Sequence, residues 1–271
     1  MDLQLKDRVI WITGAGGGIG HALAEGFGLE GARLALHART SGQGLSDWAE
    51  TREWRDNAMI LEGDLREPGD LIAMARRVLD TWGVIDVAIG NAALRVRSPE
   101  PLHEMGDDRL RDLVDTNVLG QLFFARTFLR TLKDREPDPG FGRNLIFIGS
   151  TAATFGEAGY AGYAASKAAL TGLCKSLKNE IVALDPQGRV NIVEPGWTRT
   201  IMSRPDLNDP KKVEHAMSTM PLRRIGEGFD VTHACTFLAS MASRHVTGQT
   251  ITVAGGMEGR LLHEPGDFEE E

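Results

Sequence analysis

Short runs of apolar, often β-branched residues alternate along the chain with longer stretches whose apolar residues recur at helical spacing. The short runs predict buried β-strands, and the longer stretches predict amphipathic helices. The predicted strands are Val9–Thr13, Leu34–Ala38, Ala58–Leu61, Val84–Gly90, Asn144–Gly149, Arg189–Glu194 and Thr250–Val253. The predicted helices lie near Gly18–Glu30, Leu45–Arg55, Gly69–Trp82, Asp107–Lys133, Ala161–Leu184 and Phe229–Met241.

This alternation is typical of repeated βα units, which build parallel sheets. It predicts an α/β fold with one doubly wound, parallel, seven-stranded sheet and helices on both faces. No Pro/Ser-rich linker divides the chain, so we expect one domain over residues 1–262 and an acidic, frayed tail over 263–271. Pro and Gly residues predict irregular structure over 135–143 and 198–220.

Composition narrows the function further. The 271 residues include 30 Lys and Arg against 38 Asp and Glu, a net charge of −8, which argues against a nucleic-acid binder. No apolar run approaches the roughly 18 residues of a membrane span, and the mixed-charge start is unlike a signal peptide. The two distant cysteines and the spacing of the histidines indicate reduced thiols and no metal site. We therefore expect a soluble, intracellular protein in the cytoplasm, and a small anionic ligand is not excluded because local arginines can override the overall charge.

A glycine-rich turn follows the first predicted strand and opens the first predicted helix. Its sequence, TGAGGGIG at residues 13–20, allows close backbone approach and positive φ angles. A helix N-terminus behind such a turn offers free N–H groups to a dinucleotide pyrophosphate. The turn therefore predicts nucleotide binding, the alternative being a merely flexible connection between strand and helix.

The tip of the second predicted strand indicates which nucleotide is bound. NAD-binding folds usually place a carboxylate here for the ribose 2′-hydroxyl, but no Asp or Glu lies between Gly31 and Ser46. Arg39 stands at the tip beside Thr40 and Ser41 and could bind a 2′-phosphate, which favours NADP(H). The alternative is an arginine stacked on adenine, which would leave NAD(H) possible.

Further polar residues follow other predicted strands or interrupt helices. Tyr163 and Lys167 share one helix face at i, i+4 spacing, so that the ammonium can lower the phenol pKa. Ser150 ends the fifth strand, at the sheet edge where ligands bind. Asn117 interrupts a long helix, and Asp64 ends the third strand, where it could accept from the adenine amino group. The alternatives are a surface Tyr–Lys pair, a solvated Asn and a helix N-cap.

Together these residues resemble the short-chain dehydrogenase/reductase family, in its compact single-domain branch. The resemblance covers residues 5–257 and includes TGxxxGxG at 13–20, YxxxK at 163–167 and the Pro-Gly segment at 194–200. It implies a Rossmann-type fold and an oxidoreductase that transfers a hydride between a nicotinamide and a secondary alcohol/ketone pair. It also implies a homo-oligomer, because relatives commonly assemble as tetramers through two long helices, here 107–133 and 161–184.

The resemblance also implies roles for individual side chains. Tyr163 would exchange a proton with the substrate oxygen, and Ser150 would hydrogen-bond that oxygen. Lys167 would lower the pKa of Tyr163 and bind the nicotinamide ribose, while Asn117 would hold a water in the proton relay. Thr198 and Thr200 would fix the carboxamide. The implied cofactor-binding set is Gly14, Gly16, Gly18, Ile19, Gly20, Arg39, Asp64, Leu65, Asn91, Tyr163, Lys167, Pro195, Gly196, Thr198 and Thr200.

Two points depart from the family pattern or stay open. The family's Asn-Asn-Ala-Gly segment is Gly-Asn-Ala-Ala at 90–93, and Ala93 would either narrow the mouth of the site or shift the following loop. The substrate lid corresponds to 198–220, with Met202, Met217 and Met220 either as an adaptable wall or as ordinary packing. Four arginines either border the cleft or are solvated on the surface: Arg95, Arg97, Arg199 and Arg204.

The substrate itself is not identified by the sequence. A non-catalytic cofactor-binding regulator or scaffold remains an alternative, although an intact serine, tyrosine and lysine set argues against it. Enoyl reduction is a second alternative, but related enoyl reductases usually space the tyrosine and lysine more widely than four positions.

Overall fold

A computed structural model gives the fold and describes residues 2–40, 42–94, 98–133, 135–200, 203, 207–257 and 259–261. Within these residues, no helix combines the length and apolar character needed to cross a membrane. The predicted tail at 263–271 lies outside the described residues, as do Ser41, Arg95, Arg97, Met202 and Arg204.

One parallel sheet of seven strands organises the chain, as the alternating pattern predicts. Its strand order is β3-β2-β1-β4-β5-β6-β9, so the chain moves outward in one direction from β1 and then crosses over to β4. The crossover leaves a crevice at the carboxyl ends of β1 and β4, where doubly wound sheets bind their ligands. The strands are β1 (Val9–Ile12), β2 (Arg33–Ala38), β3 (Ala58–Glu62), β4 (Val87–Gly90), β5 (Asn144–Ile148), β6 (Arg189–Pro195) and β9 (Thr250–Val253).

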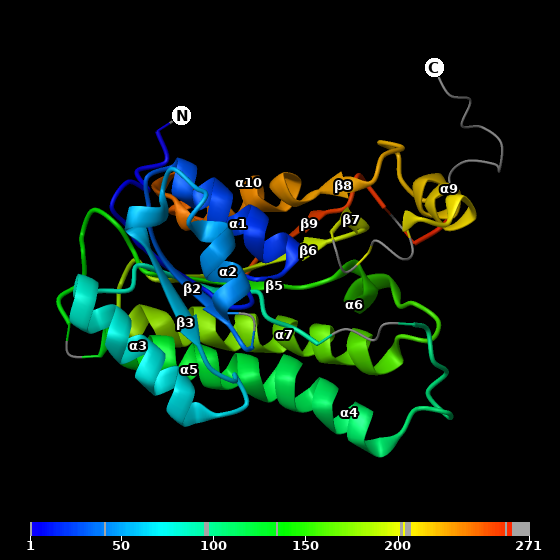
Figure 1. The fold of residues 1–271 in the computed structure, drawn as a ribbon, viewed down its shortest axis with the longest axis horizontal. Coiled ribbons are helices and arrows are strands. Elements are labelled where there is room, and N and C mark those ends of the chain that lie inside the picture. The colour runs from blue at the N-terminus through cyan, green and yellow to red at the C-terminus, as the bar shows by residue number, and fades with distance from the viewer. Residues whose placement is uncertain are drawn as a thin grey trace.

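Helices cover both faces of this sheet (Figure 1). One face is covered by α1 (Gly18–Leu29) and α10 (Gly228–Ala239), with α2 (Gly42–Ala49) beside them. The other face is covered by α3 (Pro68–Trp82), α5 (Gly120–Leu132) and α7 (Ala161–Glu180). The predicted three-layer α/β architecture is confirmed.

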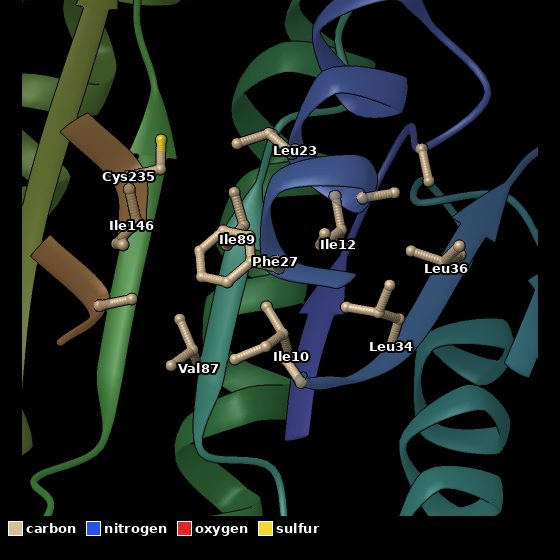
Figure 2. Packing of buried hydrophobic residues seen from close by; sticks show 14 of the residues in the cluster. Ile10, Ile12, Leu23, Phe27, Leu34, Leu36, Val87, Ile89, Ile146 and Cys235 are labelled. Atoms are coloured by element: carbon tan, nitrogen blue, oxygen red, sulfur yellow. The ribbon is translucent and has the colours of Figure 1, made fainter. Parts of the chain in front are cut away.

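Alternation along each strand divides the core in two. Figure 2 shows Ile10 and Ile12 of β1 packed with Phe27 of α1 on one face. Trp11 points to the other face, where its ring meets Phe124 of α5 edge-on with 4.7 Å between centroids. Because strand side chains alternate between faces, a shift of one residue in register would exchange the two cores.

Several predicted elements differ in their bounds or are interrupted. The predicted helix at 107–133 is α4 (Asp107–Val114), the π-helical turn η2 (Asp115–Leu119) and α5. The strand predicted from Val84 begins at Val87. The helix predicted to end at Arg55 stops at Ala49, before the 3₁₀ turn η1 (Arg55–Asn57). Two other helices end in 3₁₀ turns, η3 (Ile181–Ala183) after α7 and η4 (Met241–Ser243) after α10.

The stretch over 198–220, predicted to be irregular, contains ordered elements. Pro210 is one of the residues on which that prediction rests, but in the structure it is the first residue of α9 (Pro210–Ser218). Asp209 caps this helix, and its carboxylate accepts from the Lys211 N–H at 3.0 Å. Proline is well tolerated in the first turn of a helix, where its missing N–H costs nothing. The sequence prediction also omits α6 (Thr151–Phe155) and a small sheet of β7 (Thr198–Arg199) and β8 (Gly226–Glu227).

Candidate active site

A cavity of about 450 Å³ lies at the carboxyl edge of the sheet, over the ends of the central strands. It collects every predicted cofactor-binding residue and three of the four predicted catalytic residues. Those lining it are Gly14, Gly16, Gly18, Ile19, Gly20, Arg39, Asp64, Leu65, Asn91, Ser150, Tyr163, Lys167, Pro195, Gly196, Thr198 and Thr200. Residues from seven separate parts of the chain are therefore brought together, while Asn117 stands apart.

The glycine-rich turn between β1 and α1 is held so tightly that side chains are excluded. Gly14 has φ +64°, and a Cβ atom there would lie 2.7 Å from the Cα of Ala92. A Cβ at Gly18 would lie 2.5 Å from the Cβ of Thr200. Gly17, at the N-cap of α1, gives the helix no side-chain cap. The first N–H groups and the positive dipole end of α1 are thus open to an anionic ligand, the arrangement that binds pyrophosphate.

The segment after β4 is hydrogen-bonded to this turn. The Asn91 side chain donates from Nδ2 to the carbonyl oxygens of Thr13 and Gly14, each at 3.0 Å. The Asn91 N–H in turn donates to the Thr13 hydroxyl at 3.0 Å. Ala93, where the family has glycine, lines the cavity with an ordinary negative φ, so the alanine fits without backbone strain.

The end of β2 contributes no carboxylate to the cavity. Ala38 is buried at 3% exposure, and Arg39 beyond it is exposed at the rim. Among the described lining residues, Arg39 and Lys167 are the only Lys or Arg side chains.

Asp64, which follows the neighbouring strand β3, also lines the cavity and is bound to Arg66. The Arg66 guanidinium donates to both carboxylate oxygens, with Nη2 2.7 Å from Oδ2 and Nε 3.1 Å from Oδ1. These hydrogen bonds lower the pKa of Asp64 below its usual value. The alternative that Asp64 caps a helix is wrong, because α3 has Glu67 at its N-cap. Sequence reasoning missed Arg66, two positions away.

Ser150, Tyr163 and Lys167 converge from two elements. Ser150 follows β5 by two residues and caps α6, where its Oγ accepts from the Ala152 N–H at 3.3 Å. Lys167 lies one helical turn after Tyr163 on α7, with Nζ 6.0 Å from the centroid of the tyrosine ring. Its ammonium donates to the Ile148 carbonyl at 2.7 Å, and burial lowers the pKa of Lys167 to about 8. The lysine is therefore fixed beneath the phenol and still mostly charged at pH 7.

Asn117 is buried in the π-helical turn η2, so the alternative of a solvated Asn is wrong. Its Oδ1 accepts from the Leu94 N–H at 2.7 Å, and its Nδ2 donates to the Leu94 carbonyl at 2.8 Å. Nδ2 also donates to Ser166 Oγ at 3.0 Å, and that hydroxyl donates to the Tyr163 carbonyl at 2.7 Å. The side chain thus links the loop after β4 to α7, and Thr116 rather than Asn117 lines the cavity.

The cavity is also lined by residues that sequence reasoning did not assign. Glu157, from the loop between α6 and α7, and Trp197, after β6, both line it. Trp197 belongs to the Pro-Gly segment at 194–200, and its place in that motif is the sequence signal that could have assigned it to the site. Arg199 does not line this cavity. Its side chain is directed to Glu227 on the neighbouring strand β8, where its Nε donates to the carboxylate at 3.0 Å. Met217 and Met220 pack around Ile225, so for these two the packing interpretation holds.

A comparison with known protein families agrees with this arrangement. Residues 14–258 match a model of short-chain dehydrogenases/reductases whose description is enoyl-(acyl carrier protein) reductase. The chain belongs to the short-chain dehydrogenase/reductase family. It is therefore an NAD(P)-dependent oxidoreductase that acts by hydride transfer on a small-molecule substrate.

Individual relatives cover nearly the whole chain. The 3-oxoacyl-(acyl-carrier-protein) reductase FabG of Escherichia coli is 29% identical over 257 residues, 94% of this chain and 99% of that protein. An L-rhamnose 1-dehydrogenase (NAD(P)(+)) of Azotobacter vinelandii is 31% identical over 263 residues, 94% of this chain and 98% of that protein. The crystal structure of a putative gluconate dehydrogenase from Agrobacterium tumefaciens is 25% identical, with TM-score 0.84, over 95% of this chain and 98% of that one.

Proposed function

We propose that this short-chain dehydrogenase/reductase interconverts a secondary alcohol and a ketone with NADP(H), using Tyr163 as the acid/base. The observation that carries the proposal is one cavity lined by Ser150, Tyr163 and Lys167 and by the glycine-rich turn. A non-catalytic binding protein would not need a buried lysine, Lys167, next to Tyr163 in the wall of this cavity.

In this proposal each side chain has one task at the substrate oxygen. Tyr163 donates its phenolic proton to that oxygen in reduction and withdraws it in oxidation. Ser150 donates a hydrogen bond to the same oxygen. The Lys167 ammonium, held by the Ile148 carbonyl, lowers the pKa of the phenol and thereby eases proton transfer near neutral pH. Asn117 fixes the loop and helix that flank the tyrosine, and a water-holding role for it remains a prediction.

The cavity fits a dinucleotide. Its pyrophosphate would lie on the turn at Gly14–Gly20, where a Cβ at Gly14 or Gly18 would collide with neighbours. Arg39 would bind a 2′-phosphate, and Asp64, together with Arg66, would face the adenine. Thr198 and Thr200 would fix the carboxamide, and Lys167 the nicotinamide ribose. A bound nicotinamide supplies the hydride, and this chain's side chains orient the ring and exclude water.

The names of the relatives suggest two carbonyl classes to test. One relative is a 3-oxoacyl reductase, and another is a sugar dehydrogenase. Enoyl reduction is a second candidate because the matching family model is described by that activity. The four-residue spacing of Tyr163 and Lys167 favours carbonyl reduction, since related enoyl reductases usually space these residues more widely.

A substrate screen tests the proposal directly. NADPH and NADH consumption is measured over 3-oxoacyl thioesters, keto sugars, simple ketones and enoyl thioesters, and the reverse reaction over matching alcohols. We expect turnover with a ketone or secondary alcohol. Turnover confined to enoyl thioesters would support the second candidate, and cofactor binding without turnover would support a regulator.

We also propose a homotetramer, with residues 1–262 as one domain of each cytoplasmic subunit. The described face of α5 and α7 carries a groove lined by apolar side chains, including Phe123, Leu129 and Leu173. Leu122 on this groove is 39% exposed. A symmetric contact with a second copy would remove this surface from water.

The assembly is checked by light scattering at micromolar concentration. We expect the mass of four chains for the native protein and a smaller assembly for Leu122→Glu, because a buried unpaired carboxylate opposes association. Ile72→Glu, at a 44% exposed position on α3, is the control and should leave the mass unchanged. A monomeric native protein would contradict the proposal.

A further inference from the structure

A buried histidine joins the two chain segments that flank the adenosine half of the cavity. His37 lies in β2 with 1% exposure and contributes to the lining of the cavity. Its Nδ1 accepts from the Gly14 N–H at 3.2 Å, and its Nε2 lies 2.9 Å from the Gly63 carbonyl oxygen. Gly14 begins the phosphate-binding turn, and Gly63 immediately precedes Asp64. The imidazole therefore bridges the turn and the end of β3.

These partners allow only one protonation state of the ring. The Gly14 N–H can only donate, so Nδ1 must offer a lone pair, and the Gly63 carbonyl can only accept, so Nε2 must carry the proton. This state is the neutral Nε2–H tautomer. A protonated imidazolium would place an N–H on Nδ1 against the Gly14 N–H, and the turn would have to move to relieve the contact.

We infer that His37 is a positioning residue for the dinucleotide, and that its neutral form is needed to hold Gly14 in the phosphate-binding conformation. This inference rests on the proposed function, because it concerns the affinity of the same cavity for its cofactor. It assigns a role to a polar residue inside an otherwise apolar strand, a signal that the sequence contains but that motif reasoning did not use.

The charges around the ring support the neutral form at physiological pH. Burial lowers the pKa of His37 below its ordinary 6.5, while the nearby carboxylates of Asp64 and Asp70 act in the opposite direction. Arg39, just beyond the end of β2, is the nearest cation in sequence, and the turn at Gly14 contributes no charge. Because the folded pKa is lowered, the bridge is complete above pH 6.5 and is lost as pH falls through the lowered value.

Two neutral replacements separate the halves of the bridge. His37→Asn places an amide oxygen near the position of Nδ1, so it can still accept from Gly14. His37→Gln places an amide nitrogen near the position of Nε2, so it can still donate to Gly63. Neither side chain titrates, and the pair serves as a matched test of which contact matters for binding.

The measurement is the Kd of NADPH by its fluorescence, from pH 5 to pH 8, with apo-protein thermal unfolding as the control for folding. At pH 8 we expect His37→Asn to bind within about threefold of the native protein and His37→Gln to bind about tenfold more weakly, the worth of one buried hydrogen bond. As pH falls through the lowered pKa of His37, the affinity of the native protein should fall relative to that of His37→Asn. The 2′-phosphate titrates near pH 6, but it contributes equally to both proteins and cancels in this ratio.

Equal NADPH Kd values for His37→Asn and His37→Gln at pH 8 would overturn the inference, because the two variants keep opposite halves of the bridge. NADH provides a second check on the native protein alone, because it lacks the 2′-phosphate, and its Kd should also rise as pH falls. If one variant fails to fold, the other still decides: about tenfold weaker NADPH binding by folded His37→Asn, or native-like binding by folded His37→Gln, would overturn the inference. Failure of the proposed function is distinct, since it would appear as no dinucleotide binding at pH 8 in any variant.

Discussion

Replacing Tyr163 by phenylalanine is expected to lower kcat on the best substrate of the screen by about 10²–10⁴-fold, the usual worth of general acid–base catalysis. The change removes the phenolic hydroxyl and keeps the ring that packs against the small apolar cluster of Met105, Leu113 and Tyr160. The fold and the cavity should therefore persist. The loss should fall on kcat and kcat/KM alike, because the proton transfer is made in the transition state.

The matched control for this variant is cofactor binding. The Kd of NADPH should stay within a few-fold of the native value, because the ring and Lys167 are retained. Native turnover in Tyr163→Phe, with cofactor binding intact, would show that another group transfers the proton. Lys167→Met should lower activity as well, with weaker cofactor binding, since Lys167 is also placed at the nicotinamide ribose.

The sheet and the grouping of the site residues were predictable because both depend on strong local patterns. Buried parallel strands must be apolar along their length, so their positions are visible in a single sequence. Once the strands are placed, topology brings their carboxyl ends together. Gly14, Ser150 and Pro195, far apart in the chain, line one cavity for that reason.

Details that depend on contacts between distant segments were not predictable. Asn117 interrupts an apparently continuous helix, but no local pattern indicates a π-helical turn or the bonds to Leu94 that it serves. Arg66 binds Asp64 through a side-chain orientation that the sequence does not specify. The bridge made by His37 depends on Gly14 and Gly63, which are 23 and 26 positions away.

The native protein is expected to prefer NADPH over NADH by roughly ten- to a hundredfold in kcat/KM, because charge-assisted hydrogen bonds from Arg39 to a 2′-phosphate contribute about 1.5–3 kcal/mol each. Arg39 is exposed at the rim of the cavity, and its guanidinium can donate two parallel hydrogen bonds to the oxygens of one phosphate group. Gly17, where many NADP-dependent relatives carry a basic residue, supplies no second cation, so the preference depends on Arg39.

The double variant Ala38→Asp, Arg39→Leu should reverse this preference while retaining turnover with NADH. The new carboxylate would accept from a ribose 2′-hydroxyl and repel a 2′-phosphate, and the leucine would remove the attraction to that phosphate. Arg39→Leu alone separates the two effects: it should weaken NADPH about tenfold or more and leave NADH nearly unchanged. The measurement is kcat/KM for both coenzymes at fixed ionic strength, because contacts at an exposed arginine are screened by salt. Native kcat/KM that is equal or higher with NADH would show that Arg39 does not read the 2′-phosphate, and would favour the arginine stacked on adenine.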